Sequence, residues 1–256
     1  MMEERRVVVN GLLVNYRVFG ASEAQKSLLI LHGWPSSSEK WMPTAELLSQ
    51  NRKVVVPDLP GFGKSQEPPI SWSLDTYVGW LNEFTELVPE LKRGFYLLGH
   101  SFGGALACKF TINYTQKVEK LFLAAAACIR TKTISKNALK KIAKLGKLIT
   151  WVPQYDVIRK AFYKFIVRRS DYLNVSENMK ETYLRVIADD LSQKINFIKV
   201  PVIIIWGDKD TLTPPEDAEF MKEKIPGSKL ILMPGVGHAL QVQQPEVLAQ
   251  NISTNF

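Results

Sequence analysis

The chain has 256 residues, of which 46% are hydrophobic and 23% charged, and its formal net charge is +8. This composition is ordinary for a globular protein, and a chain of this length buries enough core to need neither a disulfide framework nor a structural metal. No apolar run reaches the length of a transmembrane helix, and the N-terminal MMEERRVVV lacks the apolar stretch of a signal peptide, so a cytoplasmic protein is expected.

The first elements in chain order are a hairpin and a series of buried strands. In VVVNGLLVNYRVFG, Asn10-Gly11 suits the two positive-φ positions of a type I′ turn, which predicts a β-hairpin. The runs that follow are continuously apolar, as is typical of parallel strands buried on both faces. In order they are SLLILHG, KVVVPDLPGFG, FYLLGHS, LFLAAAA, VIIIWGD and KLILMPG.

Helical stretches separate most of these runs. They cover residues 74–91, 102–114 and 217–224. Strands and helices that alternate in this way predict right-handed crossovers and a mostly parallel, doubly wound sheet with helices on both faces.

Residues 129–199 interrupt the alternation. They contain no good strand candidate and three amphipathic helical stretches, at about 139–152, at about 157–169 and from Ser176, a suitable N-cap. The third stretch is expected to bury Met179, Tyr183, Val186 and Ile187. The segment is therefore predicted to be a helical insertion in a core formed by residues 1–128 and 200–256.

The strongest chemical signal is the stretch GHSFGG, residues 99–104, which follows an apolar run and opens a helical stretch. A nucleophilic serine needs its hydroxyl held on a sharp strand-to-helix turn, and small residues two before and two after allow that turn to pack. We therefore interpret Ser101 as a nucleophile rather than a passive serine in a glycine-rich turn.

A serine hydroxyl is a weak nucleophile unless a base takes its proton. His238, in GVGHAL just after the last apolar run, is the candidate base. Two acids follow VIIIWG, and we prefer Asp210 as the one that orients the imidazole, because it stands a few residues beyond the strand. Asp208 is expected to cap the turn instead.

An acyl-transfer site also needs two N–H donors for the oxyanion of its tetrahedral intermediate. The backbone of Phe102, directly after the nucleophile, is one candidate. The second is the backbone of Trp34 in the loop His32-Gly33-Trp34-Pro35.

Together these motifs resemble those of the lid-bearing α/β-hydrolase superfamily, in the group of carboxylesterases and related carbon–carbon hydrolases. The resemblance covers almost the whole chain and implies the α/β-hydrolase fold, with residues 129–199 as a lid over the active site. It also implies a structural role for His32 and a structural turn at residues 58–65, whose spacing is not that of a phosphate loop. The matching motifs are, in order, HGWP, DLPGFGKS, GHSFGG, GDKDTLTP and GVGHAL.

The serine at position 101 favours an acyl-enzyme, because haloalkane dehalogenases and epoxide hydrolases of this fold attack with an aspartate. A carboxylic ester hydrolase for small to medium acyl groups is the first expectation. A carbon–carbon bond hydrolase of ring-fission products, a slow-hydrolysing ligand receptor and peroxyacid formation as a side activity remain open. No cofactor or metal is expected, since Cys108 and Cys128 fit a buried core and the three histidines all lie in motifs.

The positive charge is unevenly spread. Residues 129–199 carry 16 Lys and Arg against 6 Asp and Glu, so the whole positive excess falls in the predicted lid. This segment is either a solvated helical surface or a field that attracts an anionic substrate or an acidic partner, such as an acyl-carrying protein or a negatively charged membrane surface. No nucleic-acid recognition motif is present.

Overall fold

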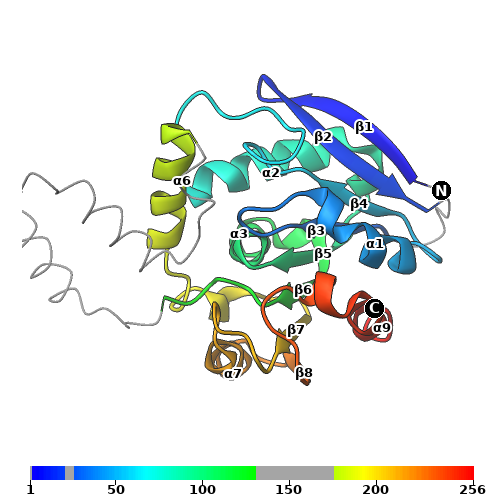
Figure 1. Ribbon diagram of the computed structural model, residues 1–256, viewed down its shortest axis with the longest axis vertical. Coiled ribbons are helices and arrows are strands. Elements are labelled where there is room, and N and C mark those ends of the chain that lie inside the picture. The colour runs from blue at the N-terminus through cyan, green and yellow to red at the C-terminus, as the bar shows by residue number, and fades with distance from the viewer. Residues whose placement is uncertain (1, 21–25, 131–175) are drawn as a thin grey trace, which may run out of the picture.

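A computed structural model of the chain describes residues 2–20, 26–130 and 176–256 (Figure 1). Within these ranges, eight strands form one sheet in the order β1-β2-β4-β3-β5-β6-β7-β8. The pairs β1–β2 and β2–β4 are antiparallel, and the other pairs are parallel. The strands are β1 (Met2–Val9), β2 (Leu12–Phe19), β3 (Leu28–Leu31), β4 (Val54–Pro57), β5 (Phe95–His100), β6 (Val118–Ala124), β7 (Val202–Gly207) and β8 (Lys229–Met233).

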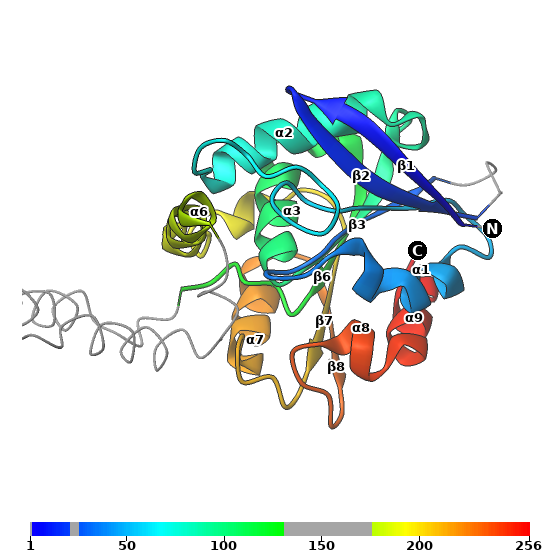
Figure 2. The ribbon, with the colours of Figure 1, turned by 45° about the horizontal axis from the view of Figure 1, so that its top comes forward.

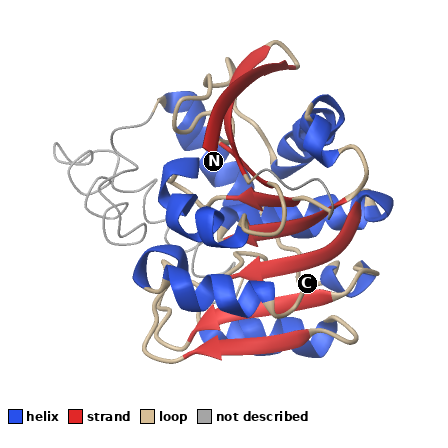
Figure 3. Cartoon of the chain, turned by 90° about the vertical axis from the view of Figure 1, so that its right-hand side faces the viewer, coloured by secondary structure: helices blue, strands red, loops and turns tan. Residues whose placement is uncertain are grey.

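The predicted hairpin is confirmed as β1 and β2. Asn10 and Gly11 adopt φ values of 49° and 80°, the left-handed region that a type I′ turn requires. Val9 pairs with Leu12 directly beside the turn. The hairpin extends beyond the other strands and places β1 at one edge of the sheet (Figure 3).

The central strands have the burial that their apolar runs predict. Every residue of β3, β4 and β7 is buried, because helices cover both faces of the sheet there. β8 differs, since it ends the sheet and among the described strands pairs with β7 alone. Lys229 is exposed and Leu232 is 43% exposed, so the expectation of burial on both faces is wrong for this strand.

The helices form two layers, with α2, α3 and α7 on one face of the sheet and α1 and α9 on the other (Figure 2). The helices α1 and α9 were not among the predicted ones; each is shorter than three turns and so carries little periodic signal. The helices of these layers are α1 (Met42–Leu48), α2 (Leu74–Leu87), α3 (Phe102–Asn113), α7 (Pro215–Lys224) and α9 (Pro245–Ser253), with the single turn α8 (Leu240–Gln243) before the last.

Of the three helical stretches predicted between residues 129 and 199, the first two lie outside the described residues. The third is α6 (Glu177–Ala188). Ser176 is its N-cap, as predicted, and the Ser176 hydroxyl accepts a hydrogen bond from the backbone N–H of Met179 at 3.2 Å.

The buried face of α6 differs in part from the prediction. Met179 and Val186 are buried, but Ile187 is 37% exposed. Thr182 is fully buried instead, because its hydroxyl accepts a hydrogen bond from the backbone N–H of Trp72 at 2.8 Å. The buried face of this helix therefore includes a polar residue that pairs with a distant loop, which the spacing of apolar residues does not predict.

Candidate active site

Ser101 occupies the sharp turn between β5 and α3, with φ 54° and ψ −116°. A residue other than glycine costs about 1–3 kcal/mol in such a sparsely populated region and persists only where its surroundings impose it. A Cβ on Gly99 would lie 2.3 Å from the carbonyl oxygen of Gly103, and one on Gly103 would lie 2.3 Å from that of Leu31. The turn therefore closes only because both of these positions are glycine.

The ring of His238 connects Ser101 with Asp210. His238 lies in the loop between β8 and α8, and its Nε2 is 3.0 Å from Ser101 Oγ. Its Nδ1 is 2.8 Å from Oδ2 of Asp210, whose side chain is fully buried. With Nδ1–H donating to the carboxylate, Nε2 is left to accept the serine proton. The structure thus brings these three predicted residues together.

Asp210 is held by more than His238. Its Oδ1 accepts the backbone N–H groups of Leu212 (2.8 Å) and Thr213 (3.1 Å), and its Oδ2 accepts the Thr213 hydroxyl at 2.8 Å. Burial alone would raise the pKa of Asp210, but the bonds from His238, Leu212 and Thr213 outweigh it and lower the pKa. Sequence reasoning missed Thr213, although a hydroxyl three residues after an aspartate is a common partner in such turns.

Asp208 makes a different contact from the one predicted. Its Oδ1 accepts the backbone N–H of Gly235 at 2.7 Å, so it ties the loop after β7 to the loop that carries His238 rather than capping its own turn. It is exposed, whereas Asp210 is buried. Within the part of the chain that the structure describes, Asp210 is the one of the two acids whose carboxylate contacts the His238 ring.

The loop from His32 to Ser38 lies directly against Ser101. A Cβ on Gly33 would be 3.1 Å from Cβ of Ser101. The ring of His32 is fully buried, donates from Nδ1 to the Gly33 carbonyl at 2.8 Å and accepts the Leu59 N–H at Nε2, at 3.0 Å. Desolvation lowers the pKa of His32, which keeps the ring neutral. His32 therefore fixes the start of this loop.

The two predicted oxyanion donors belong to segments that contact each other. Phe102 is the first residue of α3, where backbone N–H groups have no acceptor within the helix. The Trp34 ring makes edge-to-face contacts with Phe102 and Phe62, with centroids 5.7 and 4.6 Å apart. Packing of these rings thus joins the loop 32–38 to the start of α3.

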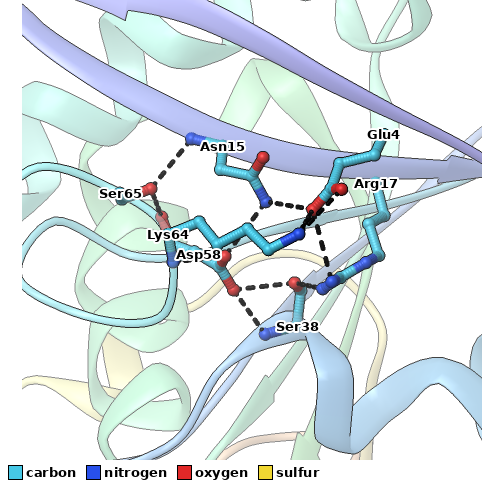
Figure 4. A network of polar contacts seen from close by, with 7 residues as sticks. All are labelled: Glu4, Asn15, Arg17, Ser38, Asp58, Lys64 and Ser65. Carbon is cyan, nitrogen blue, oxygen red and sulfur yellow. Dashed lines mark hydrogen bonds and ion pairs between the residues drawn. The ribbon is translucent and has the colours of Figure 1, made fainter.

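A buried polar network fixes the other end of the loop (Figure 4). Oδ1 of Asp58 accepts both the N–H and the hydroxyl of Ser38 at 2.7 Å, and Arg17 also reaches that hydroxyl. Oδ2 accepts the Lys64 N–H at 3.0 Å and the Asn15 amide at 3.1 Å. Burial would raise the pKa of Asp58, but these bonds lower it. Residues 58–65 therefore form a structural turn, as the resemblance implied.

His100, the residue before Ser101, is a buried neutral side chain. Its Nε2 donates to the backbone carbonyl of His238 at 2.9 Å. Desolvation, followed by the nearby His238 ring, lowers the pKa of His100 to about 3. His100 thus braces the loop that carries His238.

In the part of the chain that the structure describes, no group of three or more His, Cys, Asp or Glu side chains is arranged to hold a metal ion. Cys108 and Cys128 are buried, unbridged thiols whose sulfurs lie 3.1 Å apart. Burial raises the pKa of the Cys108 thiol, so it stays protonated and packs as a small core residue.

A family model described as the alpha/beta hydrolase family matches residues 28–251, a range that contains Ser101, Asp210, His238 and the loop 32–38. The chain belongs to this family. Among the relatives of this α/β-hydrolase are lipases and esterases. Lipase 1 of Psychrobacter immobilis is 26% identical over 248 residues, which cover 89% of this chain and 76% of that one.

Two further relatives cover similar shares of the chain. Monoacylglycerol lipase ABHD6 of Homo sapiens is 24% identical over 263 residues, covering 93% of this chain and 77% of the lipase. The pimeloyl-[acyl-carrier protein] methyl ester esterase of Nitrosomonas europaea is 27% identical over 237 residues, covering 86% of this chain and 91% of the esterase. These relatives support a hydrolase, with ester hydrolysis as its class of reaction.

Solved structures show the same fold. The crystal structure of a membrane phospholipase A, a bacterial virulence factor, superposes with a TM-score of 0.77 at 24% identity and covers 99% of this chain and 85% of that one. An esterase from Thermogutta terrifontis gives 0.73 at 21% identity, covering 98% and 97%. In the described ranges of this α/β-hydrolase, no helix is long and apolar enough to cross a bilayer.

Proposed function

We propose that this α/β-hydrolase cleaves carboxylic esters of small to medium acyl groups through an acyl-enzyme on Ser101. The observation that carries the proposal is the pair of hydrogen-bond distances at His238, 3.0 Å to Ser101 Oγ and 2.8 Å to Asp210 Oδ2. These two contacts link a nucleophile, a base and an orienting acid in one hydrogen-bonded chain.

In the proposed acylation step, Ser101 Oγ attacks the ester carbonyl while Nε2 of His238 takes the hydroxyl proton. Asp210 keeps its negative charge beside the imidazolium that forms. The carbonyl oxygen becomes an oxyanion, which accepts the backbone N–H groups of Trp34 and Phe102. The tetrahedral intermediate then collapses, the C–O bond to the alcohol breaks, and His238 returns the proton to the leaving oxygen.

Deacylation repeats these roles with water. His238 takes a proton from the water that attacks the acyl carbon, and the same two N–H groups receive the second oxyanion. When this intermediate collapses, His238 protonates Ser101 Oγ. The acid is released and the enzyme returns to its starting state, so the cycle consumes one water and needs only side chains and backbone of the chain.

The test is an ester panel of graded acyl length on the wild type and Ser101→Ala. Turnover in the wild type and a loss on the order of a million-fold in Ser101→Ala support the proposal. A purified, folded Ser101→Ala protein that keeps turnover within about tenfold of wild type would show that the serine is not the nucleophile.

The same samples separate the alternative activities. Ring-fission products are added to the panel as carbon–carbon substrates, and the reaction products are resolved by chromatography. Carbon–carbon cleavage that exceeds ester cleavage would replace the ester proposal with carbon–carbon hydrolysis. The receptor hypothesis would replace the ester proposal if two results came together. These are turnover far below about 10 per second on every ester and ligand-dependent association with a protein partner.

A further inference from the structure

The helix α6 is fastened to the core although it lies in the predicted insertion. Thr182 is fully buried and accepts the Trp72 N–H at 2.8 Å. Met179 fills the space beside the backbone of Gly61, where a Cβ would approach its sulfur and Cε to 2.5 Å. These contacts fix the helix on the turn 58–65 and on the segment before α2. In Figure 1, α6 lies next to the start of α2.

The C-terminal end of α6 is fastened separately. Nζ of the buried Lys109, on α3, is 2.6 Å from Asp189, which follows the helix, and 2.7 Å from Asp75 of α2. The side chains of Lys109 and Asp189 are only 8% and 22% exposed, so this ion pair is screened less by solvent than the pair with Asp75, whose side chain is 71% exposed. The helix that begins at the nucleophile thus also holds the end of α6.

Fixed in this way, α6 brings the ring of Tyr183 against the ring of Trp34. Their centroids are 5.3 Å apart and their planes are inclined by 52°. Trp34 also contacts Phe62 and Phe102, so rings from three other segments surround it. His32 and Ser38 anchor the two ends of the loop 32–38, and the three ring contacts hold the Trp34 side chain between them.

We propose that Tyr183 is a positioning residue for the oxyanion site: through its ring, α6 holds Trp34 so that the Trp34 N–H meets the oxyanion. The proposal rests on the proposed ester hydrolysis. An oxyanion donor contributes only when its N–H already points to where charge develops, so a small rotation of the loop costs rate. Because Tyr183 acts on the transition state, its loss lowers kcat and leaves KM little changed.

The experiment compares four variants of the full chain on a short p-nitrophenyl ester. Tyr183→Ala removes the ring, Tyr183→Leu keeps bulk without an aromatic face, and Tyr183→Phe restores the ring. Leu184→Ala, at the adjacent and 43% exposed position, is the matched control. We expect kcat to fall about 10- to 100-fold in Tyr183→Ala. Tyr183→Phe and Leu184→Ala are expected to keep the wild-type kcat, and KM is expected to stay unchanged throughout.

A second readout is inhibition by a boronic acid, which forms a tetrahedral adduct with a serine hydroxyl. Its affinity is expected to weaken in Tyr183→Ala by the same factor as kcat, because both depend on the oxyanion donors. A merely structural role would lower the thermal midpoint without this parallel. If Tyr183→Ala does not fold, Tyr183→Leu carries the comparison.

The outcomes separate the two proposals. A wild type without ester turnover overturns the proposed function. An active wild type in which Tyr183→Ala keeps kcat within about twofold, or changes only KM, overturns the positioning role alone. The positioning role is also overturned if Tyr183→Phe is as impaired as Tyr183→Ala, because the aromatic ring would then not be the part of Tyr183 that supports kcat.

Discussion

Asp210 shows how the site holds a charge away from water. Its carboxylate is buried but receives N–H or O–H bonds from Leu212, Thr213 and His238, so its pKa is lowered despite desolvation. A carboxylate that stays ionised can keep the imidazole of His238 in the tautomer that accepts a proton from Ser101. The nearby Asp208 has a different partner, the backbone of Gly235.

The first prediction compares these two acids. Asp210→Asn should lower kcat on the order of ten-thousandfold, because the amide can leave the imidazole in the wrong tautomer. Asp208→Asn, two residues away, is the matched control and should retain most activity, since it loses only a contact between loops. Steady-state kinetics on one ester checks both. If Asp208→Asn were the more impaired of the two variants, Asp208 rather than Asp210 would be the acid that orients His238.

The second prediction concerns Asp217, a buried residue in the first turn of α7. Burial, followed by the negative charges of Glu216 and Asp210, raises its pKa from the ordinary 3.8 to about 6. Between these values the folded state binds more protons than the unfolded state, so this group lowers stability as the pH rises from about 4 to about 6. Asp217→Asn should therefore increase the free energy of unfolding at pH 8 and change it little at pH 4.

Urea unfolding at the two pH values measures this effect. Glu219→Gln, at an exposed position of the same helix, is the control. Its free energy of unfolding relative to the wild type should be the same at pH 4 and pH 8. An Asp217→Asn protein that gains no stability at pH 8 relative to pH 4 would mean that Asp217 ionises without cost.

The sequence points to the proposed catalytic residues more readily than to the residues that hold them in place. Ser101, Asp210 and His238 stand out because each follows an apolar strand in a short motif. The contact of Thr213 with Asp210 and that of Asp208 with Gly235 depend on how loops fold against each other. A pattern of residue types along the sequence does not contain this information. The first group is local in sequence and the second arises from tertiary contacts.

At the scale of elements, the loop 32–38 takes its shape from the turn 58–65. His32 bonds to Leu59 at one end, and Ser38 bonds to Asp58 at the other. The motif DLPGFGKS identifies the turn, but its connection to the loop became visible only in the folded chain. The same is true of α6: its N-cap could be predicted from Ser176, whereas burial of Thr182 depends on Trp72.

The third prediction tests this connection. Asp58→Asn replaces an acceptor by a donor opposite the buried Asn15 amide and the part-buried N–H of Lys64, so these donors lose their acceptor. The free energy of unfolding should fall by about 2–3 kcal/mol. Glu39→Gln, an exposed change next to Ser38, should have little effect. Equal stability of both variants in urea unfolding would contradict a bracing role for Asp58.

At the scale of the whole molecule, the fold was predictable because buried parallel strands give continuous apolar runs separated by helices. The exceptions lie at the margins, where β8 is an exposed edge and the short helices α1 and α9 carry weak patterns. The division into a core and an inserted lid at residues 129–199 stays a prediction. So does the role of its positive charge, most of which lies outside the described residues.

The fourth prediction concerns that charge. If it recruits substrate, an anionic ester should have a higher kcat/KM than a neutral ester of equal length, and the advantage should shrink with salt, as the Debye length falls from about 10 Å at 0.1 M to about 3 Å at 1 M. Changing Lys140, Lys144 and Lys147 to Glu should remove the preference and leave neutral-ester turnover nearly unchanged. A ratio that neither salt nor these changes alter would leave the lysines as a solvated surface.

The central claim is that Ser101 is the nucleophile of an ester hydrolase, and covalent labelling tests it most directly. The protein is incubated with a fluorophosphonate, its intact mass and residual ester turnover are followed together, and the modified peptide is mapped. We expect one adduct per chain, on Ser101, that forms in step with the loss of turnover and is absent from Ser101→Ala. An adduct on another residue, or full ester turnover in a protein labelled at Ser101, would contradict the account.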